Sequence, residues 1–268
     1  MTSLPKTLPP LPRNHRWKRE LPVRIINTWL HNGWNDFRKS PGSSLLYGFT
    51  IYLVSLAIVF GLFYLKLDYI LFPVFSGFLI VGPTIAIGLY EKSRRLASKD
   101  PIKFTSLVFV KPRSGGQILF AGVLLALLML LWLRAAVILY ALFFGLLPFQ
   151  GLNEIAPQLF HTSAGWSLMV TGSLVGGLFA AFAYAISVFS LPMLMNEKTD
   201  ALSAMGASLA LVWNNLPVML AWGAVVLALF LVSIVSGFIG LIVIFPLLGH
   251  ATWHAYRTFR PENGNRPD

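Results

Sequence analysis

Six long runs of apolar residues constrain this chain more than any other feature of its sequence. Crossing about 30 Å of hydrocarbon takes about 20 apolar residues at 1.5 Å each. Runs of this length, with no Asp, Glu or Lys near their centres, occur at residues 44–65, 69–90, 117–139, 166–193, 217–235 and 238–254. Only 12% of all residues are charged, whereas soluble domains carry about 25%. The sequence therefore predicts an all-α membrane protein with six transmembrane helices.

The boundary between the last two runs depends on a single break. Residues 218–249 form one apolar stretch without a charged side chain, which is too long for one helix across a bilayer. The pair Ser236-Gly237 interrupts it, followed by Gly240. Because Ser-Gly pairs favour turns, we expect a tight hairpin there.

The distribution of cationic residues predicts the orientation. Nineteen of the 21 Lys and Arg residues lie before the first run, in the loops 91–116 and 193–216, or after the last run. The opposite side holds Lys66, and Arg134 lies at the edge of the third run. The positive-inside rule then puts both termini in the cytoplasm. The net charge of +11 is explained by membrane insertion and by attraction to anionic lipid headgroups, without a nucleic-acid partner.

The segments between the runs divide the rest of the chain. Residues 1–21 form a basic, proline-rich tail without the apolar core of a signal peptide, so we expect disorder there, as in the tail at 259–268. The membrane domain is expected to cover residues 22–258. Within it, apolar positions spaced by three and four predict amphipathic helices on the cytoplasmic surface. They lie near residues 22–40, 100–111 and 199–214.

Each predicted surface helix precedes an odd-numbered run, which indicates an internal repeat. The second run of each pair contains a proline followed by polar residues at its cytoplasmic end: Tyr90-Glu91, Asn196-Glu197, and His250 with His254. A threefold repeat of surface helix, span and span explains this pattern. Chance similarity among apolar helices is the alternative. Repeats in membrane proteins often surround a shared site.

Four segments resemble a known family. They are residues 33–38 (GWNDFR), 82–95 with its Gly-Pro and Tyr-Glu-Lys-Ser-Arg-Arg, 190–194 (SLPML) and 246–257 (PLLGHATWHAYR), the last being the most specific. Together they are similar to bacterial integral membrane proteins that share a domain of unknown function, some of which carry the label of cytochrome c oxidase subunits. The resemblance covers about residues 25–258. It implies a bacterial inner-membrane location and no particular activity.

The oxidase label can be tested on the histidines. A haem-copper catalytic subunit needs six histidine ligands, and this chain has 5 histidines in total. The chain therefore cannot be that subunit, although an accessory role is compatible with the count.

Two histidines near the cytoplasmic end of the sixth run are the leading site candidates. His250 and His254 are four residues apart, so a helix places them on one face. Three interpretations are open: interfacial histidines bonded to backbone or headgroups, a polar cluster shared with His31, Glu91 and Arg94, or a pair of haem or metal ligands. Two histidines alone are a weak metal signal, because zinc sites normally use three or four protein ligands.

Arg134 is the one charge within an apolar run. A charge at mid-bilayer costs about 2.5 to 3.5 kcal/mol, so such a residue is expected near water or a counterion. The simpler interpretation is an arginine that reaches the outer headgroups beside Trp132. The alternative is an ion pair on the outer side with Glu154 or Asp68.

The sequence lacks the signatures of several classes of function. The chain has no cysteine, which excludes disulfides and thiolate metal sites. No carboxylate or lysine lies at mid-membrane, which argues against an ion-coupled carrier. We therefore expect a non-enzymatic membrane protein without a cofactor, which serves as a scaffold or accessory of a membrane-protein complex or handles lipid. A haem- or metal-binding redox accessory and a channel or carrier are the alternatives.

Overall fold

The computed structural model describes residues 17–102, 104–110, 112–145 and 152–260. Within these ranges the chain forms helices and no strand, which confirms the all-α class. The helices in chain order are α1 (Ile25–Lys39), α2 (Pro41–Tyr64), the 3₁₀ helix η1 (Asp68–Ile70), α3 (Leu71–Ile85), α4 (Ile87–Ser98), α5 (Phe104–Val108), α6 (Gly115–Phe144), α7 (Leu152–His161), α8 (Ser163–Ser187), α9 (Ser190–Asn196), α10 (Ala201–Asn214), α11 (Leu216–Val235) and α12 (Leu241–Phe259).

Five segments among the described residues are long and apolar enough to cross a bilayer. Two of them are pairs of consecutive helices, since α3 continues into α4 and α8 into α9. The five correspond in order to the first five predicted spans. They are Pro41–Tyr64, Leu71–Ser98, Gly115–Phe144, Ser163–Asn196 and Leu216–Val235.

The sixth predicted span, residues 238–254, is not confirmed. The predicted hairpin does form: Gly237 and Phe238 have φ values of 64° and 68° and turn the chain between α11 and α12. However, α12 is not among the five candidate spans. Its C-terminal half carries His250, His254 and Arg257, and these polar residues lower its hydropathy below that of a spanning helix. The threefold repeat stays a prediction.

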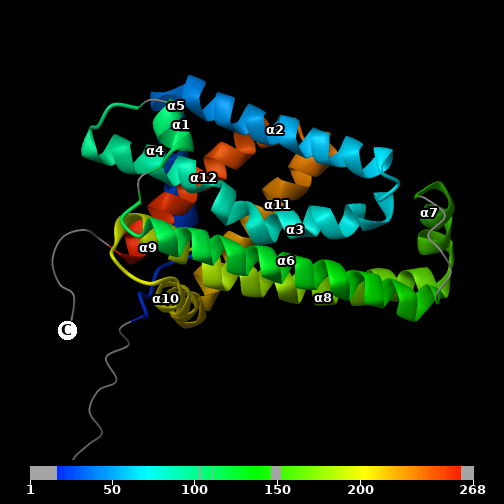
Figure 1. Cartoon of the computed structure of the whole chain (residues 1–268). Helices are drawn as coiled ribbons and strands as arrows, with labels where there is room; N and C mark the ends of the chain where they lie inside the picture. Colours follow the sequence, from blue (N-terminus) through cyan, green and yellow to red (C-terminus); the bar gives the residue numbers. More distant parts are fainter. Residues whose placement is uncertain (1–16, 103, 111, 146–151, 261–268) are drawn as a thin grey trace, which may run out of the picture.

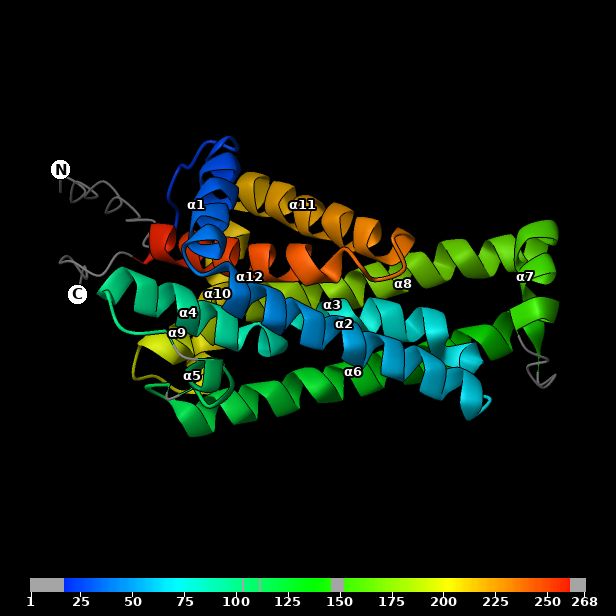
Figure 2. The same cartoon turned by 90° about the horizontal axis from the view of Figure 1, so that it is seen from above.

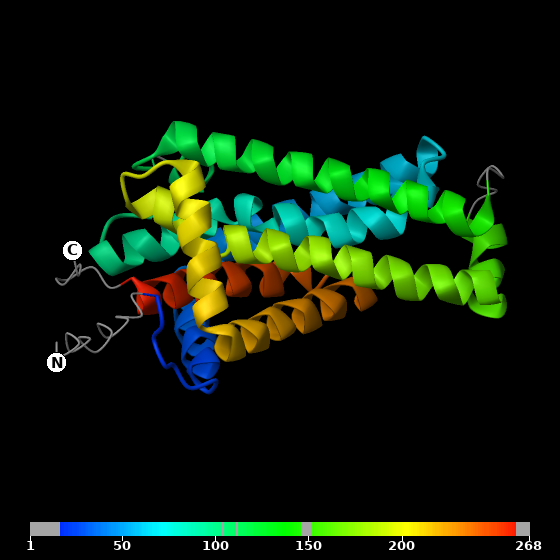
Figure 3. The ribbon, with the colours of Figure 1, turned by 90° about the horizontal axis from the view of Figure 1, so that it is seen from below.

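The long helices run side by side, and α1 crosses one end of this bundle (Figures 1 and 2). The helix α10 also lies across that end, as the yellow helix in Figure 3 shows. The beginning of α1 and the end of α12 lie at this same end, whereas α7 lies at the other. The α11–α12 turn stops short of the far ends of α6 and α8 (Figure 3).

Helices form at nearly the positions of two of the three predicted surface helices. In α1, Ile26, Trp29 and Phe37 are buried at spacings that share one helix face. At the start of α10, the Asp200 side chain caps the helix by accepting a hydrogen bond of 2.9 Å from the Ser203 backbone N–H. The helices predicted near 22–40 and 199–214 are therefore α1 and α10.

The surface helix predicted over residues 100–111 is much shorter than expected. Only α5, with five residues, forms there. The predicted N-cap, Asp100, is used differently: its backbone N–H donates to the Arg95 carbonyl, and Lys99 adopts a left-handed conformation with φ of 58°. This arrangement ends α4, and the next helix begins only at Phe104.

The best-packed core lies toward the end of the bundle that α1 and α10 cross, and it includes the ends of the second and fourth spans. Leu89, Phe189, Trp253, Tyr256 and Phe259 are at most 2% exposed there. Along the spans, by contrast, many apolar side chains point outward. Leu131 and Leu178, for example, are 58% and 71% exposed, which is the surface expected to face lipid tails.

The described parts of both predicted tails make contacts with the bundle. Trp17 and Arg19, both inside the predicted N-terminal tail, hydrogen bond through their backbones to the Asn215 side chain at the α10–α11 junction. Phe259 is buried and Arg260 is hydrogen bonded, so the first two residues of the predicted C-terminal tail pack on the bundle. Residues 1–16 and 261–268 lie outside the described part of the chain.

Candidate functional site: a polar cluster at one end of the bundle

His250 is the centre of a buried polar network. Its side chain is 0% exposed, its Nε2 atom lies 2.9 Å from Ser44 Oγ on α2, and its Nδ1 atom lies 2.9 Å from Ser93 Oγ on α4. Lys92 is also 0% exposed and donates to Ser44 Oγ and to the Ser40 carbonyl, both at 2.6 Å. A buried polar group must have partners to avoid a desolvation cost. Here residues of α2, α4 and α12, together with Ser40 at the end of α1, supply these hydrogen-bond partners to one another.

The donors and acceptors in this network have a consistent direction. Because an ammonium group only donates, Ser44 accepts from Lys92 and turns its own hydroxyl hydrogen to His250 Nε2. His250 is then neutral and carries its hydrogen on Nδ1, from which it donates to Ser93. We call Ser44, Lys92, Ser93 and His250 the buried relay.

The relay leads to Asp36 on α1. Burial alone would raise the pKa of the Asp36 carboxyl, but the hydrogen bond to His254 and the neighbouring Ser93 hydroxyl outweigh it and lower the pKa below its ordinary value. The Nε2 atom of His254 lies 2.7 Å from Asp36 Oδ2. Thus both predicted histidines belong to one connected polar cluster, although each has different partners.

The outer side of the Asp36–His254 pair faces an open surface depression of about 470 Å³. Asn32, Asn35, Arg38 and Lys39, all from α1, complete its lining. Since this depression is open and lined by polar residues, it lets solvent reach the outer end of the cluster. The buried relay itself does not line it.

Glu91 and Arg94 form an ion pair, but within α4. The Glu91 side chain is 0% exposed and accepts from Arg94 Nε at 2.8 Å and from Arg95 Nε at 2.6 Å. Neither histidine is among these partners. His31 is exposed on α1 and lies outside the cluster. The structure thus brings His250 and His254 together through Asp36 and Ser93, while Glu91 and Arg94 form a separate pair and His31 joins neither.

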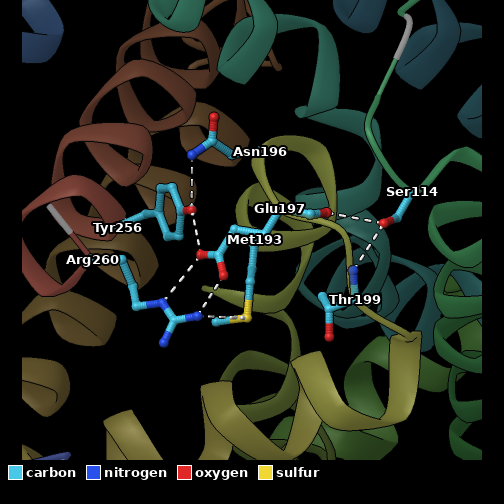
Figure 4. Close-up of polar contacts among 7 residues, drawn as sticks. All are labelled: Ser114, Met193, Asn196, Glu197, Thr199, Tyr256 and Arg260. Atoms are coloured by element: carbon cyan, nitrogen blue, oxygen red, sulfur yellow. Dashed lines mark hydrogen bonds and ion pairs between the residues drawn. The ribbon is translucent and has the colours of Figure 1, made fainter. Parts of the chain in front are cut away.

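A second polar cluster joins α9 to the end of α12. Tyr256 Oη donates to Glu197 Oε1 at 2.9 Å, and Arg260 binds the same carboxylate with Nε at 3.1 Å and its terminal nitrogen at 2.5 Å (Figure 4). The Asn196 side-chain Nδ2 donates a hydrogen bond of 3.3 Å to Tyr256 Oη. Burial would lower the pKa of Arg260, but the hydrogen bond to Glu197 raises it.

Ser114 extends this second cluster to α6. Its hydroxyl donates to the Glu197 carbonyl at 2.9 Å and accepts from the Thr199 backbone N–H at 3.1 Å (Figure 4). The chain before α6 is therefore tied to the chain before α10 at the same end of the bundle.

The predicted outer ion pair of Arg134 and Glu154 stays a prediction. Arg134 is exposed on α6, as expected for an arginine that reaches headgroups. The side chain of Glu154 lies outside the described residues.

The arrangement of the histidines does not favour direct ligation. Both ring nitrogens of His250 are hydrogen bonded to serines, and His254 is bonded to Asp36. Among the described side chains, no group of three or more His, Asp or Glu residues is placed to hold a metal ion.

Sequence reasoning missed Asp36, Ser44, Lys92 and Ser93. Asp36 did carry a signal, because it shares the apolar face of α1 with Trp29 and Phe37, where an acidic residue needs a partner. The others carried none, since their role depends on contacts between residues at least 48 positions apart.

The chain was compared with known families, curated proteins and solved structures. No curated protein and no solved structure matches it. The model of one family, described as "Predicted integral membrane protein (DUF2189)", matches residues 71–196, which run from α3 to the end of α9. This range includes Lys92 and Ser93 but not α1 or α12. This chain is thus an integral membrane protein that carries, over residues 71–196, a match to the DUF2189 family, a domain of unknown function.

Proposed function

We propose that the protein is a non-enzymatic accessory protein of the bacterial inner membrane that binds anionic lipid headgroups through the end of the bundle crossed by α1 and α10. In this proposal that end faces the cytoplasm, as do both termini. Scaffolding of a membrane complex and lipid handling were both open from the sequence. The exposed side chains at this end of the bundle favour lipid binding over scaffolding.

The observation that carries the proposal is a ring of exposed cations. They come from the segment before α1, from α1 itself, and from the loops that precede α5, α6 and α10, all at the same end. They are Lys18, Arg24, Arg38, Lys39, Lys99, Arg113 and Lys198. Each basic residue near an anionic membrane surface contributes about 1 kcal/mol of attraction, so a ring of this size can select anionic lipids.

Exposed apolar side chains at the same end complete an interfacial surface. On α10, Leu202 and Trp213 are 64% and 70% exposed. On α1, Trp34 stacks on Phe37 with ring centroids 5.2 Å apart and is 40% exposed, and it lies four residues before Arg38. Exposed tryptophan on a surface that also carries cations is typical of the boundary between hydrocarbon and headgroups.

The polar cluster supports a structural rather than a catalytic role for the buried residues. The charged groups of Glu91, Lys92 and Glu197 are each bonded to groups of this chain at 2.6 to 2.9 Å. A satisfied buried network makes one arrangement of helices more stable than others. Such a network holds α1, α4, α9 and α12 in place beneath the cationic ring.

The test compares lipids bound to two variants of the full chain. Arg24, Arg38 and Lys99, all exposed at the cationic end, are changed together to glutamine, and Lys66→Gln at the other end serves as the control. Native mass spectrometry after extraction from mixed phosphatidylglycerol and phosphatidylcholine membranes counts the bound lipids. We expect the triple variant to lose most of its phosphatidylglycerol preference and Lys66→Gln to retain it. Equal preference in both variants would refute the proposal.

A further inference from the structure

A small cavity lies between α3, α8, α11 and α12, within the membrane-spanning part of the chain. Its volume is about 100 Å³, and its walls are mainly apolar. Phe78 on α3 stacks on Phe230 of α11 at 5.3 Å and meets Phe245 of α12 edge-on at 5.8 Å. These rings form part of the lining. The cavity is separate from the polar cluster, because none of the buried relay lines it.

Two polar groups that line this cavity lack partners within the described chain. The Trp222 side chain is 0% exposed, and its indole N–H has no hydrogen-bond acceptor. The hydroxyl of Tyr90, whose side chain is 2% exposed, also makes no hydrogen bond to a described residue. Buried polar groups are nearly always paired. The buried indole N–H of Trp222, with the Tyr90 hydroxyl on the lining of the same apolar cavity, therefore indicates a ligand with hydrogen-bond acceptors.

Two other polar side chains that line the cavity do have hydrogen-bond partners. Tyr184 Oη donates to the Met219 carbonyl at 2.8 Å, and Thr252 Oγ1 donates to the Leu248 carbonyl at 2.8 Å. These hydroxyls are satisfied within their own part of the bundle, whereas Trp222 and Tyr90 are not.

The size of the cavity limits the class of ligand. An engineered cavity of about 150 Å³ holds one benzene, so a cavity of about 100 Å³ can enclose only part of a lipid-sized molecule. The remainder must lie outside, and the surroundings of a membrane-spanning segment are lipid. A lipid chain that enters the cavity while the rest of the molecule stays in the bilayer meets this condition.

We propose that the cavity binds the ester-proximal part of one acyl chain of a membrane phospholipid, with the ester carbonyl accepting from Trp222 and Tyr90. The depth is suitable: Trp222 lies six residues after the start of α11 at Leu216, about 9 Å along the helix. This places it just below the headgroup level of the cationic end. The proposal does not depend on headgroup charge and is therefore independent of the function proposed above.

Gly82 provides a steric test. It lines the cavity, and a Cβ added there would meet only Phe78 Cε1, at 3.9 Å. Gly82→Leu would therefore place a side chain in the space assigned to the lipid. Gly172→Leu on α8 is the matched control, because a Cβ there meets nothing within 4 Å and the residue does not line the cavity.

The experiment uses the full chain in phosphatidylcholine nanodiscs that contain a phosphatidylcholine with a photoactivatable diazirine near the ester end of one chain. After irradiation, mass spectrometry maps the labelled peptides. We expect labelling on α3 and α11 next to the cavity, reduced at least fivefold by Gly82→Leu and unchanged by Gly172→Leu. Tyr90→Phe and Trp222→Phe, which each remove one donor, should reduce it severalfold.

The outcomes separate this proposal from headgroup binding. Cavity labelling should be equal with phosphatidylcholine and phosphatidylglycerol probes, whereas binding at the cationic ring should favour the latter. Size-exclusion chromatography identifies variants that fail to fold, and Tyr90→Phe, which removes a single oxygen, keeps the test decisive if Trp222→Phe fails. Labelling that Gly82→Leu leaves unchanged, or that Tyr90→Phe does not reduce, would overturn the proposal.

Discussion

Asp36 and His254 are 218 positions apart in the chain, yet Asp36 Oδ2 lies 2.7 Å from His254 Nε2. This contact joins α1, the first helix described, to α12, the last. Because Ser93 of α4 also bonds His250, one polar cluster fixes three helices that the chain connects only through the intervening spans. The arrangement of the cationic end therefore depends on a few specific hydrogen bonds.

Asp36 should make the stability of the protein sensitive to acid. Its pKa in the folded protein is below the ordinary value of 3.8, so folding favours the ionised carboxylate. The stability that it contributes is present above the ordinary pKa and is lost as pH falls through the lowered folded value. We expect the unfolding temperature in detergent to fall below about pH 4 and to fall less in Asp36→Asn. Equal acid sensitivity in both proteins would contradict this role.

Gly48 should be needed for the contact between α2 and α12. A Cβ at this position would overlap the carbonyl oxygen of Ile242 on α12, whereas a Cβ at Gly61 of the same helix would meet nothing within 4 Å. Forcing extra volume into a packed interface costs about 1 to 3 kcal/mol. Gly48→Ala should therefore lower the free energy of unfolding by about that amount, measured by titration with a denaturing detergent. Gly61→Ala, in a helix interior, should be neutral or slightly stabilising.

Glu197 and Arg260 should be coupled energetically. Arg260 binds the Glu197 carboxylate with two nitrogens, and Tyr256 binds the same carboxylate. Residues in one such network show coupling energies of about 0.5 to 3 kcal/mol. A double-mutant cycle with Glu197→Gln and Arg260→Gln should give a coupling within that range, whereas Lys198→Gln, on an exposed neighbour, should give none with Arg260→Gln. Additive effects of the first pair would show that the contact contributes little.

The orientation can be tested directly, because the chain contains no cysteine. Single variants Lys99→Cys and Lys66→Cys place one thiol at each end of the bundle, both at exposed positions. In intact spheroplasts, a membrane-impermeant maleimide should label Lys66→Cys and should label Lys99→Cys only after lysis. Labelling of both positions before lysis would contradict the predicted topology.

The sequence predicted most of the helices but few of the contacts. Apolar runs near 20 residues follow from the thickness of the bilayer, so the first five spans could be located without any knowledge of packing. The α11–α12 hairpin was also predictable, because Gly237 permits the positive φ that the turn requires. The surface helix near 100–111 was predicted at the wrong length, since the role of Asp100 in ending α4 depends on the conformation of Lys99.

The polar cluster was predictable only in part. The spacing of His250 and His254 placed both on one helix and near one end of the bundle. Their partners, Asp36 and Ser93, come from α1 and α4, and no local pattern connects those helices. Lys92 was counted with the cations of a cytoplasmic loop, whereas it is 0% exposed and bonded to Ser44. The burial of Lys92 results from tertiary packing, which the local sequence does not show.

The joining of α1 to α12 has a consequence for biogenesis. The ribosome delivers α1 before any span and α12 after all of them, so Asp36 and Ser44 leave the exit tunnel long before His254 and His250 exist. Until the final hairpin is inserted, the buried face of α1 lacks its main packing partner, α12. Nascent chains truncated before α12 should therefore be recognised by proteases that degrade incompletely assembled membrane proteins.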